Sequence, residues 1–329
     1  MKRLAQQKVN RFLECFTPED RVLIVINADP DAIASAMAVK RLLWRRVAAI
    51  VITHVNRIDR PDNQTMIQKL GVKLISFDHV DIPSFSRTVM VDSQPSHHEG
   101  FARIERFDVV IDHHPQTEFD ADFKDIRPDY GATSSIMTEY LLAAKIKLSA
   151  RLASGLIYAI KTDTRNFERQ AIQEDLRAFQ LLYKHANLPL LRKIESAEFK
   201  PEYLRYFRYA LQTFRLRHEK IYVHLGEVVH PDVCVMIADF FMKVQSVAWT
   251  VVSGICQDKL TVIFRNDGIR KNAGSLAQKA FGTIGSAGGH KSMARAELPM
   301  KKIEALIEHP TDTRIIRWIV ERVEGKSDS

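Results

Sequence analysis

The sequence predicts an α/β protein, with a doubly wound, mostly parallel sheet in the N-terminal part and a smaller α/β domain in the C-terminal part. Two observations lead to this prediction. Apolar, β-branched segments alternate with segments of helical periodicity through the first half of the chain, a pattern typical of parallel β-α-β units. The pattern changes near residue 190, and 329 residues are enough for two separate hydrophobic cores.

The first expected strand is the apolar run RVLIVIN at residues 21–27, whose lack of alternation is typical of a strand buried on both faces. A helical pattern follows at residues 28–46. Two later helices are expected in SSIMTEYLLAAKI and RLASGLIYAIKTD, the first with Ser134 or Ser135 as its N-cap. The other strands expected in this domain are AAIVITHV (48–55), KLISF (73–77), RTVMVD (87–92) and FDVVID (107–112).

Beyond residue 190, EYLRYFRYALQTFRLRHEK predicts a basic amphipathic helix. We expect its apolar side to pack between the domains, because the aromatic residues keep helical spacing; the alternative is that its arginines follow a nucleic-acid backbone. We place the domains at residues 1–190 and 219–329, with a linker helix at 191–218. The apolar residues of this helix are Tyr203, Phe207, Ala210, Leu211 and Phe214, and its arginines are Arg205, Arg208, Arg215 and Arg217.

After this helix, the segments KIYVHLGEVV, VAWTVVSGI and KLTVIFRN predict the strands of a second sheet. The segments VCVMIADFFMKV, NAGSLAQKAF and DTRIIRWIVERV predict helices. This second set of alternating elements supports a separate α/β domain.

Composition limits the partners. The net charge of +8 favours anionic partners such as nucleotides, short nucleic acids or polyphosphate. The three cysteines are far apart and odd in number, so no disulfide framework or zinc-ribbon spacing is present and a cytoplasmic location is expected. No apolar run is long enough to cross a membrane, and no zinc-finger, basic-zipper or RNA-recognition motif predicts binding to long duplex nucleic acid.

Acids and histidines collect where expected strands end. Asp29 and Asp31 follow the first strand, Asp92 ends a later one, and the triplet 112–114 (Asp-His-His) ends the next, while Asp163 ends an apolar helix. Any one of these residues is ordinary in a surface turn. In an open α/β sheet, however, the carboxyl ends of parallel strands share one edge. Carboxylates brought together there would repel one another unless cations neutralise them, so the sequence predicts a site for divalent metal ions.

The ordered motifs DPDAIAS, VMVDS, VVIDHHP, GATSS and IKTDTRNF resemble the core of the DHH phosphoesterase superfamily. In the second half, VIFRN and GSAGGHKSMARA resemble the DHH-associated C-terminal domain. In layout the chain is similar to the two-domain oligoribonuclease and phosphoadenosine-phosphate phosphatase members. The resemblance implies metal-dependent hydrolysis of phosphate esters or anhydrides.

The resemblance also implies residue roles. His114 would face the scissile phosphate as a ligand or proton donor, and Asp112 would orient its neighbours. The implied metal ligands are Asp29 for a first ion, Asp31, His113 and Asp163 for a second, and Asp92 bridging the two. The residues implied to bind substrate phosphate in the C-terminal domain are Arg265, Gly288, Gly289 and His290.

The chain departs from the family pattern at two positions. Val25 stands where the family has a metal-binding histidine, so the first ion would be held more weakly. Asn27 is a poor substitute, and the pair His97 and His98 could reach the gap, although such loop histidines are usually surface residues. Ala287 occupies the first glycine position of the GGGH-type motif and needs a negative φ to avoid strain.

We therefore expect a phosphoesterase that uses two Mn²⁺ or Mg²⁺ ions and acts on short single-stranded oligonucleotides or small nucleotides in a cleft between the domains. One alternative is a polyphosphate or pyrophosphate hydrolase. Another is a non-catalytic nucleotide-binding regulatory protein with a degenerate metal site, which Val25 motivates. A homodimer is compatible with the sequence, which leaves the oligomeric state open.

Overall fold

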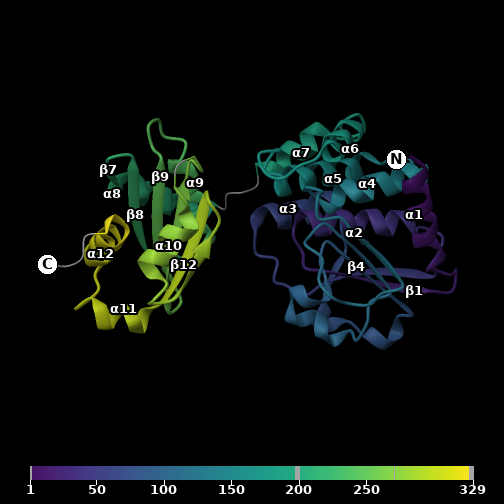
Figure 1. Cartoon of the computed structure of the whole chain (residues 1–329), viewed down its shortest axis with the longest axis horizontal. Coiled ribbons are helices and arrows are strands. Elements are labelled where there is room, and N and C mark those ends of the chain that lie inside the picture. The colour runs from purple at the N-terminus through teal and green to yellow at the C-terminus, as the bar shows by residue number, and fades with distance from the viewer. Residues whose placement is uncertain (1, 197–200, 270, 326–329) are drawn as a thin grey trace. The chain divides into compact units, whose positions relative to one another are not determined.

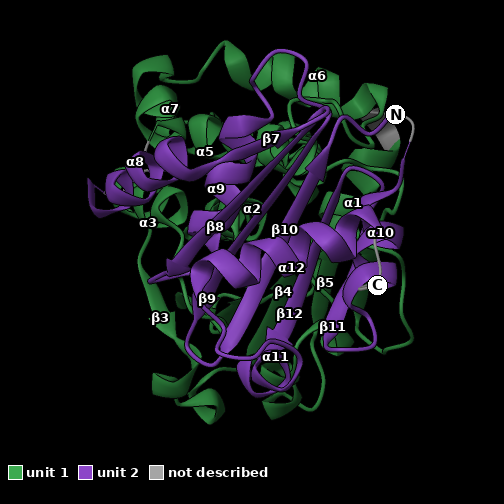
Figure 2. Ribbon diagram, turned by 90° about the vertical axis from the view of Figure 1, so that its left-hand side faces the viewer, with its two compact units in different colours: residues 1–199 green, residues 200–329 purple. Residues whose placement is uncertain are grey.

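The structure, a computed structural model, describes residues 2–196, 201–269 and 271–325 (Figure 1). The chain divides into two compact units, residues 1–199 and 200–329, which Figure 2 colours separately. Each unit has its own sheet and its own core, as the sequence predicts. Among the described residues, no helix is long and apolar enough to span a membrane.

The first unit is built on a six-stranded sheet with the order β3-β2-β1-β4-β5-β6, in which every neighbouring pair is parallel. This is the strand order of a doubly wound sheet, so the predicted fold class is confirmed for this unit. The strands are β1 (Arg21–Ile26), β2 (Ala49–His54), β3 (Leu74–Ser76), β4 (Arg87–Val91), β5 (Val109–Asp112) and β6 (Phe123–Ile126).

The two faces of this sheet are covered differently (Figure 1). Val22, Ile24 and Ile26 of β1 belong to a large core cluster shared with the helices, whereas Leu23 and Val25 point to the opposite face, towards residues of short 3₁₀ segments. The helices are α1 (Lys2–Glu14), α2 (Pro30–Leu42), α3 (Pro61–Leu70), α4 (Thr133–Ala143), α5 (Ala150–Asp163), α6 (Gln173–Tyr183) and α7 (Leu188–Glu195). The 3₁₀ segments are η1 (Phe77–His79), η2 (Ile82–Ser84), η3 (Pro95–His97) and η4 (Glu99–Arg103).

The order of the strands creates one topological switch point. From β1 the chain proceeds outward to β2 and β3, and it then returns to place β4 on the other side of β1. The loops that follow β1 and β4 therefore leave the sheet in opposite directions and open a space between them. Asp29, Asp31 and Asp92 lie in or directly after these loops.

The second unit contains a six-stranded sheet with the order β11-β12-β10-β9-β8-β7, in which only β8 and β9 are parallel. Helices α8 and α9 contribute to the core on one face, and α10 and α12 to the core on the other. The strands are β7 (Arg215–Arg217), β8 (Lys220–Glu227), β9 (Trp249–Cys256), β10 (Lys259–Asn266), β11 (Ser286–Gly289) and β12 (Met293–Pro299). The helices are η5 (Pro201–Tyr203), α8 (Leu204–Thr213), α9 (Asp232–Phe241), α10 (Ala273–Phe281), α11 (Met300–Leu306) and α12 (Asp312–Glu324).

The expected linker helix at residues 191–218 differs from the structure. Helix α7 ends at Glu195 in the first unit, whereas α8 packs on β8 and belongs to the second unit, and residues 215–217 form the edge strand β7. Tyr203, Tyr206 and Ala210 form the buried side of this segment, while Leu211 and Phe214 are 52% and 42% exposed. The reason is that α8 packs on one face of the sheet, which covers only one side of the helix, and the helix ends before Phe214.

The predicted N-cap of α4 is also wrong. The helix begins at Thr133 with Ala132 as its N-cap, so Ser134 and Ser135 lie inside the first turn. Ala132 has no side chain that could satisfy the first N–H groups of the helix. As described below, a carboxylate from α2 accepts from two of them instead.

The two glycines of β11 differ in how closely the neighbouring backbone approaches them, and this difference can be tested. Gly289 has φ +150°, and a Cβ atom there would lie 2.4 Å from the Met293 carbonyl oxygen, whereas a Cβ on Gly288 would have nothing within 4 Å. We expect Gly289→Ala to lower the unfolding free energy by on the order of 1–3 kcal/mol. Gly288→Ala is the matched control and should change it by less than about 1 kcal/mol. Urea unfolding followed by tryptophan fluorescence measures both, and equal effects would contradict the close contact at Gly289.

Candidate metal centre

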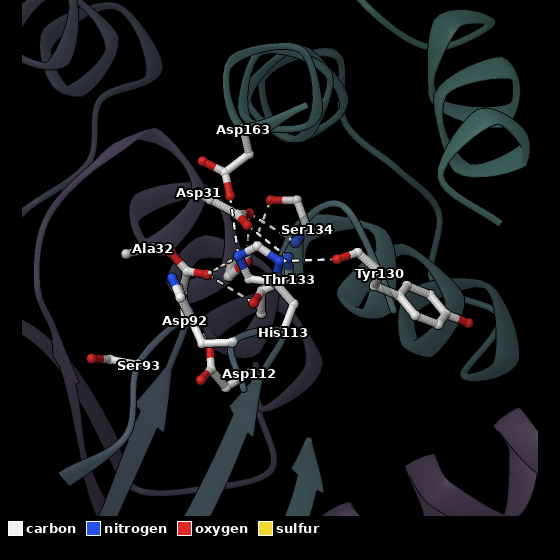
Figure 3. A network of polar contacts seen from close by, with 12 residues as sticks. Asp31, Ala32, Asp92, Ser93, Asp112, His113, Tyr130, Thr133, Ser134 and Asp163 are labelled. Carbon is white, nitrogen blue, oxygen red and sulfur yellow. Dashed lines mark hydrogen bonds and ion pairs between the residues drawn. The ribbon is translucent and has the colours of Figure 1, made fainter. Parts of the chain in front are cut away.

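Four acid and histidine side chains meet at the switch point of the first sheet (Figure 3). Asp31 lies in the first turn of α2, Asp92 directly follows β4, His113 follows β5, and Asp163 is the last residue of α5. One ligand atom of each lies within 4.8 Å of the others. The structure thus brings together four of the five predicted metal ligands, from segments up to about 130 residues apart in the chain.

Asp31 links α2 to α4. Its Oδ2 accepts the Thr133 N–H at 2.6 Å and its Oδ1 accepts the Ser134 N–H at 2.8 Å. These are two of the N–H groups that a helix leaves without partners in its first turn, and a carboxylate there also interacts favourably with the helix dipole. Burial, reinforced by the negative charge of Asp163, nevertheless raises the pKa of Asp31 to about 6. The carboxylate is therefore well oriented, but it is costly to ionise without a cation.

Asp92 leaves the sheet through a left-handed backbone conformation, with φ +59°. Aspartate tolerates this region better than most residues, and such conformations concentrate at functional sites. Its N–H donates to the Ile111 carbonyl at 2.9 Å, and its Oδ1 accepts the Thr133 hydroxyl at 2.8 Å. Burial and the charge of Asp31 raise the pKa of Asp92 well above its ordinary value.

The ring of His113 is held in one orientation. Its Nδ1–H donates to the Tyr130 carbonyl oxygen at 3.1 Å, so Nε2 is the nitrogen that faces the acids. Nε2 lies 3.2 Å from Asp163 Oδ2 and 3.6 Å from Asp92 Oδ1, yet it is buried without a hydrogen bond of good geometry (Figure 3). Burial alone would lower the pKa of His113, but Asp163 and Asp31 outweigh it and raise the pKa to about 9.

This arrangement fits a divalent cation. A buried imidazole nitrogen and three carboxylates direct their lone pairs into the same small space, which is unfavourable unless a proton or a metal ion lies between them. Imidazole with carboxylates suits Mn²⁺, Fe²⁺ or Zn²⁺, and the hydrogen bond from Nδ1 to a carbonyl is the support that metal-binding histidines usually have. The four residues could therefore hold one ion.

A second group of polar side chains lies beside the first. His114 Nδ1 donates to Asp112 Oδ1 at 2.8 Å, and the buried Gln94 donates through Nε2 to Asp112 Oδ2 at 2.7 Å. His97 packs edge-on against His114, with ring centroids 5.3 Å apart. The hydrogen bond to Asp112 raises the pKa of His114, whose side chain is 44% exposed. His114 Nε2 is thus the nitrogen left to face solvent or a ligand.

The predicted first ion has fewer ligands in the structure. Asp29 is the N-cap of α2, where its Oδ1 accepts the Ala32 N–H at 2.9 Å, and it is not part of the four-residue group. Val25 is fully buried in the apolar cluster on the far face of the sheet. His98 accepts the Gly100 N–H at 3.0 Å and packs on Phe101, so of the second histidine pair only His97 lies next to the DHH motif.

In the second unit, the predicted phosphate-binding residues lie at one end of the sheet. Arg265 on β10 is opposite Met293 on β12, and the His290 N–H donates to the Met293 carbonyl at 2.7 Å. Arg265 also donates through Nε to Asp239 Oδ1 at 2.6 Å, which orients the guanidinium group. Gly288 and Gly289 precede His290 in β11, and Ala287 pairs with Ala296 without a positive φ, as expected.

Three site residues were missed by reasoning from the sequence. Thr133 and Tyr130 support the metal ligands, and the only signal for them is their place in or beside the GATSS motif. Gln94 lies two residues after Asp92, in the VMVDS-Q continuation, and a buried glutamine in a loop has no distinctive pattern. Only the fold shows that its amide reaches the strand that carries the DHH motif.

Comparison with known proteins identifies relatives of the chain. The model of the DHH family, N-terminal domain, matches residues 21–160. An uncharacterized protein of Methanocaldococcus jannaschii is 33% identical over 301 residues, which cover 91% of this chain and 61% of the relative, so the chain spans about three fifths of that protein. An uncharacterized protein of Mycoplasma genitalium is 26% identical, covering 85% of this chain and 86% of the relative.

One solved structure shares the fold along nearly the whole chain. It is the crystal structure of an exopolyphosphatase-related protein from Bacteroides fragilis, with a TM-score of 0.72 and 14% sequence identity. The likeness covers 97% of this chain and 96% of that chain. At this identity the comparison shows a shared fold with both units present.

The acidic group makes metal binding depend on pH. The folded-state pKa of Asp31, about 6, lies above the usual aspartate value near 3.9, so the metal-free fold loses stability as pH rises from about 4 to 6. A cation binds the deprotonated ligands and reverses this loss. At a concentration about a hundredfold above its Kd, Mn²⁺ should raise the melting temperature by on the order of 5–10 °C at pH 7.5, and by much less at pH 5.

Thermal denaturation with and without Mn²⁺ at the two pH values measures this effect. Asp163→Asn, which removes one ligand charge and keeps the size of the side chain, should abolish most of the increase at pH 7.5. An increase of the same size at pH 5 and pH 7.5 would show that the cation binds elsewhere.

Gln94 should stabilise the fold by connecting Asp112 of the DHH motif to Thr117. Its Nε2 donates to Asp112, and its Oε1 accepts the Thr117 N–H at 2.6 Å and the Thr117 hydroxyl at 2.8 Å. Gln94→Ala leaves buried polar groups without partners, and we expect a loss of about 1–3 kcal/mol in unfolding free energy. Gln64→Ala, which removes one exposed hydrogen bond, is the control and should have little effect. Equal stability of the two variants in urea unfolding would be the contrary result.

Proposed function

We propose that the chain, whose residues 21–160 match the N-terminal domain of the DHH family, is a metal-dependent phosphoesterase of short oligonucleotides or small nucleotides. It would hydrolyse phosphodiester or phosphomonoester bonds with water. The observation that carries this proposal is the convergence of Asp31, Asp92 and Asp163 around His113 Nε2. Two buried carboxylates beside a third, half-buried one repel one another, and divalent cations that also bind phosphate would neutralise this repulsion.

The chain's own residues would hold two ions, Mn²⁺ or Mg²⁺. Asp31, Asp92, His113 and Asp163 would hold one, and Asp29 and Asp92 would contribute to the other, whose ligand set Val25 leaves incomplete. When bound, the ions would make water nucleophilic at neutral pH and neutralise charge on the phosphoryl group. Ordered water or substrate oxygens would have to complete the second ligand set.

His114 would contact the substrate, and Asp112 would orient His114. Asp112 holds the Nδ1 proton of His114, which leaves Nε2 to contact a phosphate oxygen or to deliver a proton to the leaving oxygen. The buried Gln94 fixes the other oxygen of Asp112, so the imidazole ring has a defined orientation. Asp112 is therefore a positioning residue, and His114 is the group in contact with substrate.

The second unit would bind the phosphate of the substrate. Arg265, Gly288, Gly289 and His290 lie at one end of its sheet, and a guanidinium group oriented by Asp239 suits a phosphate. The excess of positive charge over the whole chain, +8, agrees with an anionic substrate.

Two other functions remain candidates for the same site. Polyphosphate or pyrophosphate could also bind to the metal ions and to Arg265. The Bacteroides fragilis protein of the same fold is named as exopolyphosphatase-related. The other candidate is a non-catalytic protein that binds nucleotides. This function would follow if the first ion cannot bind because the buried Val25 offers no ligand atom. Turnover of a panel of dinucleotides, phosphoadenosine phosphate and polyphosphate, each with Mn²⁺ or Mg²⁺, distinguishes the three.

Asp92 is the residue on which the proposal depends most directly. Asp92→Asn keeps the size of the side chain and removes the charge shared by both ion sites, so turnover of the best substrate should fall by on the order of a thousandfold or more. Asp62→Asn is the control, because Asp62 is a buried carboxylate at the start of α3, outside the metal group. Steady-state kinetics and metal analysis of both variants check this. Turnover of Asp92→Asn close to that of the control would refute the assignment of Asp92.

A further inference from the structure

A cavity of about 390 Å³ lies at the C-terminal end of α2, away from the metal ligands. Residues at the ends of three helices line it: the last turn of α2, the loop after α3, and the N-cap of α5. Lys40, in this last turn, is about 14 Å along the helix axis from Asp31. The cavity is therefore separate from the site described above.

The cavity carries positive charge without nearby acids. Lys40, Arg41 and Lys73 line it, and its lining includes no aspartate or glutamate. Arg45 and Arg46 follow Trp44 in the sequence, and none of these five cations takes part in an ion pair in the described part of the chain. Arginines elsewhere in this unit, such as Arg87 and Arg127, are paired with aspartates. Three cations without an ion-pair partner in one cavity favour an anionic ligand.

An exposed tryptophan, Trp44, lines the same cavity. Trp44 is 56% exposed, whereas the chain's other tryptophans, Trp249 and Trp318, are 5% and 8% exposed. A tight turn places it there: the Arg46 N–H donates to the Leu43 carbonyl at 2.9 Å, and Arg45 has φ +60°. Trp44 is thus presented to solvent by a defined backbone conformation, although its indole would be more stable in a core.

The wall of the cavity beside Trp44 is apolar. Met37, Val72 and Leu152 contribute it, and Ser149 adds a hydroxyl group. A flat aromatic ring could therefore stack on the indole and contact aliphatic groups, while attached phosphates contact the cations. The volume lies within the range of small-molecule sites and suits one nucleotide unit.

We propose that this cavity and Trp44 form a binding site for single-stranded nucleic acid. One base stacks on the Trp44 indole, and the phosphates next to it contact Lys40, Arg41 and Lys73. A polyanion without bases would make no stacking contact with the indole or the apolar wall. A flat membrane surface would not fill a concave site. The inference does not depend on hydrolysis, because no metal ligand takes part in it.

Binding of a fluorescein-labelled 12-nucleotide RNA, measured by fluorescence anisotropy in EDTA, tests the proposal. Removal of one stacking partner should weaken binding by about tenfold or more in Trp44→Ala, and Trp44→Phe should retain most of the affinity. In Lys40→Gln/Arg41→Gln, the slope of log K against log salt should become shallower by roughly 0.7 for each phosphate that no longer meets a cation. Arg192→Gln/Lys193→Gln, which removes two exposed cations from α7 in the same unit, is the matched control and should bind like the unmodified chain.

Two results would overturn the proposal. One is an unchanged affinity of Trp44→Ala for the RNA. The other is weaker binding of Trp44→Ala to vesicles of anionic lipid while its RNA binding stays intact, which would make the cavity a membrane-binding site. Hydrolysis of a dinucleotide, assayed separately with Mn²⁺, should be unchanged in Trp44→Ala. RNA binding that depends on Trp44 in a chain without hydrolytic activity would refute the proposed function and leave this site in place.

Discussion

The repulsion among two buried carboxylates, Asp31 and Asp92, and the half-buried Asp163 is the constraint on which the candidate site of the first unit depends. Asp31, Asp92 and Asp163 direct oxygens towards the same space as His113 Nε2, and burial strengthens their repulsion. The raised pKa values of Asp31 and Asp92 express the cost of this arrangement in the metal-free chain. A divalent cation would convert the repulsion into attraction, so the same residues that destabilise the metal-free fold would stabilise the loaded one.

The surrounding structure keeps these ligands in place. The N-terminus of α4 donates to both oxygens of Asp31, the Thr133 hydroxyl donates to Asp92, and the Tyr130 carbonyl fixes the orientation of the His113 ring. Backbone groups and a short side chain supply this support, and they lose little conformational freedom when they form it. Helix α4 therefore serves the site with its first turn, while its apolar residues pack in the core.

The distribution of positive charge separates two kinds of surface in the first unit. Arg87, Arg106 and Arg127 are engaged with aspartates, so their charge is balanced within the fold. Among the described residues, no acid pairs with Lys40 or Arg41 at the end of α2, and these two cations line the same cavity as the exposed Trp44 indole. Since net charge by itself says nothing about where a partner binds, only the three-dimensional arrangement distinguishes cations that hold the fold together from cations available to a ligand.

The sequence by itself determined the class of fold and predicted four of the residues that the structure brings together at the candidate site. Alternating apolar strands and helices indicated the parallel sheet, and acids after several strands indicated the edge at which Asp31, Asp92 and His113 meet, because strand polarity makes that edge common to all of them. Only the tertiary structure decided which residues support the ligands. The contacts of Asp31 with α4, of Gln94 with Asp112 and of His97 with His114 join segments whose spacing in the chain follows no period. The same holds for the true start of α4 and the buried side of α8, because packing against neighbouring elements, and not local propensity, selects them.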